Sequence, residues 1–334
     1  MTRYVYHQIR WFFLGWIAFG FSAGINYQRL REWTWPIYLV FVALLVGLFF
    51  VPAIQNVHRW YRLPGVGISI QPSEYAKLVI VFTLAWFMER KQGVIGSFPV
   101  FCGMLLIVGI PFCLILKQPD LGTALVLYPI ALVMSYIAGM HTKALYTLGS
   151  IGAIGVCTCV LIFSGFLSHS DVKPFAMKFL KEYQYARLDP DTYHQRSAKI
   201  AVAIGGVSGS GFRQSSFSSQ KWLPAAHTDS VFAAYAEEFG FIGVAVLFSL
   251  FYSLIYFGFQ VATAAKDAYG SFLAAGITVY LAMHILMNIS MMLGLIPITG
   301  VPLLLVTYGG SSVLTTMAAL GFLQSIHSRR LMFY

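Results

Sequence analysis

The chain has 334 residues, of which 58% are hydrophobic and only 10% are charged, and its mean hydropathy is +0.73. A soluble globular domain carries about 25% charged residues, so this composition excludes one and indicates a protein solvated by a lipid bilayer. The formal charge of +10 combines two causes in such a protein, namely cytoplasmic anchoring and binding of anionic ligands.

Apolar windows of about 20 residues, the length that crosses a bilayer, recur along the chain. They predict an all-α polytopic integral membrane protein with about nine transmembrane helices. The predicted spans are 11–28, 36–54, 73–89, 99–116, 121–139, 145–165, 241–262, 271–292 and 303–326.

One connection is long, and it runs from about Phe166 to Gly240. This 166–240 loop contains the weakly apolar stretch 198–211, which is too short and too rich in glycine for an ordinary span. We therefore expect a re-entrant or amphipathic surface segment there. The serine-rich piece 208–219 predicts a flexible loop.

The short loops decide the orientation by the positive-inside rule. If the nine spans alternate, one face carries Arg29, Arg31, Arg90, Lys91, Lys143, Lys266, Arg329 and Arg330, and this face is predicted to be cytoplasmic. The 166–240 loop then faces outward. Nine spans also place the N-terminus outside beside Arg3 and Arg10, which is unfavourable for insertion. Either a further span is missing upstream, which is the simplest explanation, or this start is real and the protein inserts against a weak signal.

The four cysteines lie in apolar runs, outside the long loop, at positions 102, 113, 157 and 159. We expect them to be small buried hydrophobic residues and not part of a disulfide framework or a metal site.

The strongest candidate for chemistry is Asp229 in the segment 222–240, WLPAAHTDSVFAAYAEEFG. Two interpretations remain open from spacing alone. Asp229 or Thr228 caps a helix by accepting backbone N–H bonds, or Asp229 is a base or metal ligand whose pKa is raised by desolvation.

Three further segments carry polar residues at the ends of predicted spans, where a buried charge is costly. They are KQPD at 117–120, RW at 59–60 together with QPSEYAK at 71–77, and PITGVPLLLVTYGGSS at 297–312. Their structural interpretations are a capped turn with a local ion pair, helix capping with a tryptophan anchor, and a re-entrant packing turn. All four segments fall on the same predicted face, as a single extracytoplasmic site requires.

Several common sites have no signature in this sequence. It has no Walker loop, no G-x-G-x-x-G, no Cys/His metal pattern and no nucleophile elbow. This disfavours ATP-driven transport, nucleotide-sugar chemistry and acyl-serine hydrolysis. Isolated histidines such as His284 are expected to be packed or interfacial.

The ordered motifs resemble those of the SEDS proteins (RodA, FtsW and SpoVE), and of RodA more than FtsW. They are RW…QPSE at 59–74, KQPDLGTA at 117–124, LPAAHTD at 223–229, AEEFGFIG at 236–243 and GVPLLLVTYGGSS at 300–312. YHQRSAKIA at 193–201 and SIHSRR at 325–330 look like RodA. The resemblance covers nearly the whole chain, so 1–334 is predicted to be a single SEDS-type transmembrane domain with 166–240 as its extracytoplasmic catalytic loop.

The resemblance implies a peptidoglycan glycosyltransferase for cell elongation and shape. Such a protein polymerises lipid II on the outer face of the bacterial cytoplasmic (inner) membrane, beside a class B penicillin-binding protein and the elongation machinery. The family's essential aspartate falls on Asp229, and no nucleic acid is involved. No cofactor is required, although a divalent cation bridging the diphosphate and Asp229 fits the chemistry.

The other site residues are expected in two groups. Candidates for binding the diphosphate or sugar are Arg59, Lys117, Arg196, Lys199 and Thr228, and supporting residues are Glu74, Lys77, Asp120, Glu237, Glu238 and Ser311. Glu74 is expected to hold one of the cations in place, and Asp120 to do the same for Lys117.

The sequence departs from the family pattern in two places. The family usually has ten spans, and the family's Gln-Ser before Lys199 is Ser197-Ala198 here. Two alternative functions remain, a transporter or flippase of the lipid-linked precursor and a non-catalytic scaffold. The acidic residues crowd the predicted outer face, whereas a transport path needs ionisable groups on both faces, and this favours an enzyme.

Overall fold

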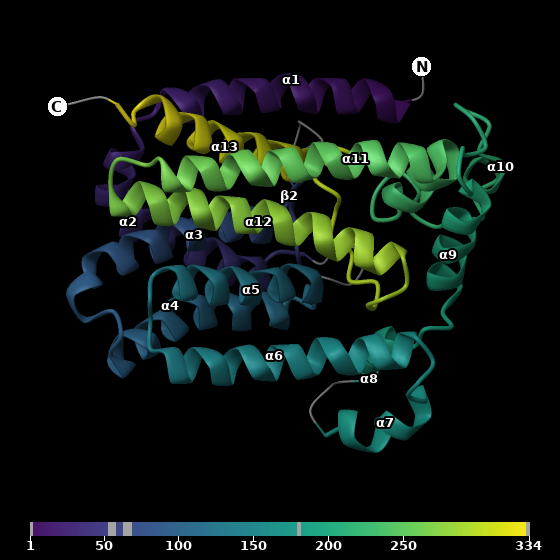
Figure 1. Cartoon of the computed structure of the whole chain (residues 1–334), viewed down its shortest axis with the longest axis horizontal. Helices are drawn as coiled ribbons and strands as arrows, with labels where there is room; N and C mark the ends of the chain where they lie inside the picture. The colour runs from purple at the N-terminus through teal and green to yellow at the C-terminus, as the bar shows by residue number, and fades with distance from the viewer. Residues whose placement is uncertain (1–2, 53–57, 63–68, 179–181, 332–334) are drawn as a thin grey trace. The chain divides into compact units, whose positions relative to one another are not determined.

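A computed structural model describes residues 3–52, 58–62, 69–178 and 182–331. Parts of the predicted span 36–54, of the segment 59–74 and of the 166–240 loop lie outside these residues. The helices of nine or more residues are α1 (Arg3–Gly24), α2 (Leu30–Gly47), α3 (Pro72–Arg90), α4 (Phe98–Lys117), α5 (Leu121–Ile137), α6 (Thr142–Phe163), α9 (Tyr193–Gly205), α11 (Val231–Thr263), α12 (Ala268–Met292) and α13 (Gly310–Ser328) (Figure 1).

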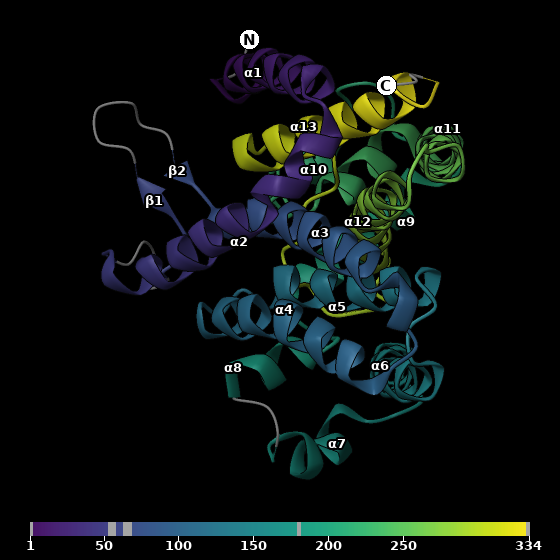
Figure 2. The ribbon, with the colours of Figure 1, turned by 90° about the vertical axis from the view of Figure 1, so that its left-hand side faces the viewer.

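The shorter elements connect these helices. They are η1 (Tyr27–Arg29), η2 (Leu48–Phe50), η3 (Gln92–Val94), α7 (His169–Ala176), α8 (Glu182–Tyr185), η4 (Ala186–Leu188) and α10 (Ser216–Ser219), with the strands β1 (Tyr61–Arg62) and β2 (Ser69–Ile70). The two strands pair antiparallel as a hairpin that the sequence did not predict (Figure 2).

A helix is present at each of the nine predicted spans, which confirms an all-α polytopic membrane protein. Among the described residues, five helical segments are long and apolar enough to cross a membrane: Tyr27–Phe50, Phe98–Lys117, Thr142–Phe163, Val231–Thr263 and Ala268–Met292. Leu121–Ile137 is apolar but shorter. The helix α3 is less apolar because it carries four charged residues, two near each end.

The chain forms two compact units. The first comprises Met1–Thr147, Leu254–Met283 and Gly309–Tyr334, and the second comprises Leu148–Ser253 and His284–Tyr308. The prediction of one domain over 1–334 stays a prediction.

In the first unit α13 lies along α1 (Figures 1 and 2). Small residues permit this close approach, as is common between membrane helices. A Cβ added at Gly321 would lie 2.5 Å from the carbonyl oxygen of Phe19, and one added at Gly15 would lie 3.0 Å from the Met317 side chain.

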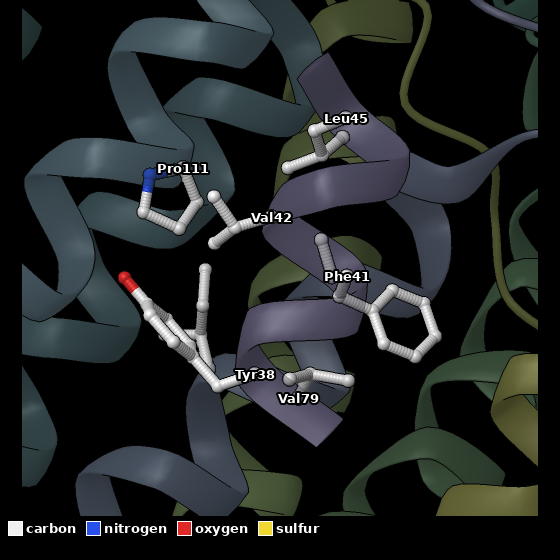
Figure 3. A pocket seen from close by; sticks show the side chains of 8 residues that line it. Tyr38, Phe41, Val42, Leu45, Val79 and Pro111 are labelled. Atoms are coloured by element: carbon white, nitrogen blue, oxygen red, sulfur yellow. The ribbon is translucent and has the colours of Figure 1, made fainter. Parts of the chain in front are cut away.

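A small apolar pocket lies between α2, α3 and α4 (Figure 3). Pro111 of α4 lacks an N–H, so the carbonyl of Ile107, one turn earlier, has no helical donor. The Tyr38 hydroxyl of α2 donates to that carbonyl at 2.9 Å. The Tyr38 hydroxyl thus takes the place of the missing helical donor. The pocket contains none of the predicted site residues.

In the second unit α11 begins at Val231, ten residues before the predicted span 241–262, and it is kinked at Gly240, where φ is 62°. The start at Val231 closely follows Thr228 and Asp229, the residues proposed as helix caps, and a neighbouring loop completes the helix at the kink. Ser210 and Gly211 donate their N–H groups to the carbonyls of Glu237 and Glu238 (2.9 and 3.0 Å). These carbonyls would otherwise accept from the two residues after the kink.

The same loop also accepts hydrogen bonds from the far side of the kink. Phe241 and Ile242 donate to the carbonyls of Gly206 and Val207 (2.9 and 3.1 Å). The 206–211 loop therefore forms hydrogen bonds with all four backbone groups freed by the break. Leaving such groups unpaired would be costly in a membrane protein.

Other expectations need correction. The stretch 198–211 is not one segment, because α9 ends at Gly205. The predicted span 303–326 is helical only from Gly310. The cysteines are free but not buried, since Cys113 and Cys157 are exposed and Cys102 and Cys159 partly exposed on the surfaces of α4 and α6.

Candidate functional site

Asp229 lies in a tight turn that precedes α11. The N–H groups of Thr228 and Ser230 both donate to the Ala225 carbonyl (2.9 and 3.1 Å), and the Thr228 hydroxyl contacts the same oxygen at 3.3 Å. Leu223 is 3% exposed and anchors the start of this segment. The turn fixes the backbone of Asp229 and engages the Thr228 hydroxyl locally.

The Asp229 carboxylate does not cap the helix. Within the part of the chain that the structure describes, no backbone N–H donates to its oxygens, and the first turn of α11 is formed by Ala234 donating to the Ser230 carbonyl at 3.1 Å. The capping interpretation of Asp229 is therefore not seen, and the carboxylate keeps its capacity to accept a proton.

Burial raises the pKa of the Asp229 carboxyl above its ordinary value, while the nearby His194 and His227 act in the opposite direction. Desolvation disfavours the charged form of a carboxyl, so this group holds a proton more readily than an exposed aspartate. A raised pKa suits a general base, because such a group works best when its pKa lies near the pH at which the enzyme operates.

The segment 284–308 forms one wall of the Asp229 site. The Asn288 amide, which is 0% exposed, donates to the carbonyls of Asp229 (2.9 Å) and Val301 (2.7 Å). At Gly300, where φ is 79°, an added Cβ would lie 3.5 Å from Oδ2 of Asp229. A hydrogen bond from the N–H of Tyr308 to the His227 carbonyl (2.9 Å) continues the contact. Two of the four predicted segments, 222–240 and 297–312, are therefore joined as far as residue 308.

The helix α9 brings a histidine to the same site. His194 Nε2 and Ser230 Oγ are 2.7 Å apart and share a hydrogen bond, and burial lowers the pKa of the His194 imidazole. His194 lies in the segment YHQRSAKIA at 193–201 but is not among the site residues predicted from the sequence. The signal was its place in the first turn of a polar helix within the long loop.

The predicted cations of α9 differ in environment. Arg196 pairs with Asp191 at 3.0 Å, and its side chain is 63% exposed. Lys199 lies against Gly294, where an added Cβ would approach its Cε to 2.0 Å. Among the residues that the structure describes, no hydrogen bond or ion pair joins either side chain to Asp229, so their binding of a diphosphate stays a prediction.

Glu237 and Glu238 hold the preceding loop against α11. The Glu237 carboxylate is 0% exposed and accepts from the N–H groups of Phe217 (2.9 Å) and Ser218 (3.0 Å) and from the Ser218 hydroxyl. Glu238 accepts from the N–H of Arg213. The serine-rich piece 208–219, predicted to be flexible, is thus tied to the helix by buried carboxylate bonds.

The remaining predicted residues lie in the first unit. Arg59 donates through Nε to the carbonyl of Gln118 (3.0 Å) and also bonds the carbonyl of Pro119. Lys117 is exposed. The RW segment and the KQPD turn are therefore in contact, as a shared site would require.

Glu74 and Lys77 form a buried ion pair at the start of α3. Their side chains are 6% and 1% exposed, and Lys77 Nζ lies 2.8 Å from Glu74 Oε1. The ammonium also lies 5.6 Å from the Tyr280 ring centroid. The cation that Glu74 holds is thus Lys77 and not one of the four predicted phosphate ligands.

The expected pairing of Asp120 with Lys117 is wrong. The Asp120 carboxylate, 5% exposed, instead accepts from Gln71 Nε2 (2.9 Å), the Ser73 hydroxyl (2.9 Å), and the N–H (3.3 Å) and hydroxyl (3.0 Å) of Thr123. Hydrogen-bond donors on α3 and α5 satisfy it, and this confirms the capped turn. The Ser311 hydroxyl accepts from the Gln71 N–H at 3.4 Å.

The described residues contain no group of three or more His, Cys, Asp or Glu side chains that could hold a metal ion. The dependence on a divalent cation stays a prediction. His284 is 0% exposed and contacts the Pro302 carbonyl at 3.4 Å, which confirms its packed role.

Comparison with known proteins gives matches over nearly the whole chain. Stage V sporulation protein E of Bacillus subtilis is 36% identical over 320 residues, 94% of this chain and 84% of that protein. The peptidoglycan glycosyltransferase MrdB of Escherichia coli strain K12 is 32% identical over 331 residues, 96% and 85% of the two chains. A probable peptidoglycan glycosyltransferase FtsW of Geobacter sp. strain M18 is 32% identical over 325 residues, 95% and 84% of the two chains. The preference for RodA over FtsW is therefore not resolved.

Solved structures share the fold. A chain from a peptidoglycan synthase complex, described as coordinating polymerization and crosslinking, aligns with a TM-score of 0.78 at 26% identity and covers 99% of this chain and 91% of that one. The crystal structure of Thermus thermophilus RodA, a rod shape determining protein, aligns with a TM-score of 0.69 at 25% identity over 98% and 88% of the two chains. The family model for cell cycle proteins of the FtsW, RodA and SpoVE type matches residues 2–331. The chain therefore belongs to the FtsW/RodA/SpoVE family.

Proposed function

We propose that this chain is a peptidoglycan glycosyltransferase that polymerises lipid II on the outer face of the bacterial cytoplasmic membrane, with Asp229 as its general base. The observation that carries the proposal is the environment of Asp229. Within the described part of the chain its carboxylate accepts no helix-capping bond, burial raises its pKa, and the surrounding turn and Asn288 fix its backbone. The names of the FtsW and MrdB relatives support the same reaction class.

The proposed reaction is a single inverting displacement. Asp229 takes the proton of the acceptor 4-hydroxyl, and the freed oxygen forms a bond to the anomeric carbon of the donor. The bond from that carbon to the diphosphate oxygen breaks with its electron pair, and polyprenyl diphosphate leaves. The leaving group supplies the driving force, and the enzyme contributes proton transfer and positioning.

The leaving diphosphate carries negative charge, which cations stabilise by charge-assisted hydrogen bonds. Lys117, Arg196 and Lys199 are the proposed ligands. Arg59 already donates to two carbonyls, so we assign it the role of shaping the KQPD turn, with any further contact made by its remaining N–H donors.

A partner that crosslinks the glycan strands completes the proposal. The solved peptidoglycan synthase complex that coordinates polymerization with crosslinking supports a class B penicillin-binding protein in this role. A function in cell elongation is proposed from the RodA-like motifs at 193–201 and 325–330.

The test is polymerisation of fluorescent lipid II by the purified chain with its transpeptidase partner. We compare the wild type with Asp229→Asn and with Asp171→Asn, an exposed aspartate of α7 that serves as a matched control. Glycan strands from the wild type and the control, but not from a folded Asp229→Asn protein, would support the proposal.

Equal activity of Asp229→Asn would exclude Asp229 as the base. If no variant makes glycan strands and the protein instead moves lipid II across vesicle membranes, the result would favour a flippase. Neither activity despite complex formation would favour a scaffold.

A further inference from the structure

His194 is held in a fixed position within the second unit. The Thr192 hydroxyl caps α9 by accepting from the Gln195 N–H at 3.4 Å. The Gln195 side chain, 1% exposed, donates through Nε2 to the Met291 carbonyl at 2.7 Å. The residue that follows His194 therefore ties α9 to the segment that also forms the wall of the Asp229 site.

The ring of His194 contacts the residue next to Asp229. Its Nε2 lies 2.7 Å from Oγ of Ser230, a residue that is 0% exposed and separated from His194 by 36 positions. A buried hydroxyl needs a partner, and removing that partner costs more than the bond contributes. The imidazole thus fixes Ser230 and, through the chain, the peptide unit that carries Asp229.

His194 also interacts electrostatically with the Asp229 carboxyl. Burial lowers the pKa of the His194 ring, and the charge of Asp229 acts against that decrease. The ring therefore holds its proton less readily than an exposed histidine, and it gains a positive charge as the pH falls. A positive charge at this position favours the ionised form of the neighbouring carboxyl.

The other charged and titratable groups around the pair have different partners. Arg196 on the same helix pairs with Asp191, and Lys199 lies against Gly294. From its own loop His227 interacts with the Asp229 carboxyl, and its ring centroid lies 6.1 Å from that of Tyr308. From the segment 284–308, His284 contacts the Pro302 carbonyl.

We infer that His194 is a positioning residue of the polymerase site, which orients Ser230 by hydrogen bonding and brings a titratable ring to the residue next to Asp229. The inference rests on the proposed function for its effect on turnover. The interaction between the two side chains is independent of which reaction Asp229 performs.

The direction of the effect follows from the charges. As pH falls, protonation of His194 places a positive charge beside Asp229, which keeps the carboxyl ionised to lower pH. The two groups then titrate as a coupled pair. Replacing His194 by glutamine removes the charge but retains a group that can bond Ser230, so Asp229 should become protonated at a higher pH.

The experiment uses the full chain with its transpeptidase partner between about pH 5 and pH 8, where a histidine titrates. The variants are His194→Gln, His194→Ala, Ser230→Ala and the control His169→Gln, a histidine stacked on Tyr185 in the same unit. One readout is the pH dependence of lipid II polymerisation. The second is labelling of Asp229 by dicyclohexylcarbodiimide, which reacts with protonated carboxyls, quantified by mass spectrometry.

We expect His194→Gln to move the midpoint of both pH profiles upward by about one unit, while His169→Gln leaves them at the wild-type position. His194→Ala and Ser230→Ala should also lower turnover at neutral pH, because the Ser230 contact is lost. If His194→Gln has the same midpoints as the wild type in both pH profiles, the inference is overturned, and the polymerase function remains intact. If the wild-type protein makes no glycan but His194→Gln still shifts the midpoint of Asp229 labelling, the interaction between His194 and Asp229 is supported and the polymerase function is rejected.

Discussion

Asp120 and Asp229 are both aspartates at the start of a helix, yet their surroundings are opposite. The Asp120 carboxylate accepts four hydrogen bonds from three residues and is 5% exposed. Among the residues that the structure describes, no backbone N–H donates to the Asp229 carboxylate, and burial raises its pKa. A carboxylate whose lone pairs are satisfied by hydrogen bonds stabilises the fold, whereas desolvation without backbone donors leaves a carboxyl with a higher affinity for a proton.

The largest expected effect is on catalysis at Asp229. Asp229→Asn removes the proton acceptor and should lower lipid II polymerisation by at least about 100-fold, because a positioned general base contributes a factor of that order. The measurement is initial rate at equal amounts of folded protein. The comparison fails if Asp120→Asn, in folded protein, produces the same loss.

The second effect is on stability at Asp120. Asp120→Ala leaves the buried donors of Gln71, Ser73 and Thr123 without their acceptor and should lower the free energy of unfolding by about 2–4 kcal/mol. Thermal unfolding in detergent with denaturant titration would measure it. A decrease of the same size in Asp229→Ala would show that the two aspartates do not differ as their contacts indicate.

Asn288 sharpens the comparison because it fixes Asp229 without touching its carboxylate. Asn288→Ala removes the bonds to the carbonyls of Asp229 and Val301 and should reduce turnover about tenfold by loosening the base. Asn288→Asp lacks the donor and should not restore the rate. Activity within twofold of wild type in Asn288→Ala would assign these bonds to packing alone.

The smallest effect is a dependence of stability on pH. A carboxyl whose pKa is higher in the folded chain binds its proton more tightly when folded, so its unfavourable contribution is absent below the unfolded pKa and complete above the folded pKa. Asp229→Asn should therefore increase stability at neutral pH, by about 0.5 kcal/mol, and change nothing under strongly acidic conditions. Unfolding midpoints at the two pH values test this, and an equal gain at both would contradict it.

The sequence by itself determined the class of the protein and the identity of the most important residue. Apolar runs of membrane-spanning length predict the helices because a bilayer excludes polar backbone that is not internally bonded. The motif LPAAHTD singled out Asp229 through its family resemblance.

Only the tertiary structure decided what each polar group does. The continuation of α11 across the kink at Gly240 depends on four backbone bonds with the 206–211 loop, about 30 residues away. Asp120 binds donors from α3, more than 40 positions earlier, instead of the adjacent Lys117. His194 and Asn288 approach Asp229 from 35 residues before it and 59 after it. Local periodicity carries no information about such pairings, because they arise when separate helices pack and each buried polar group must find a partner.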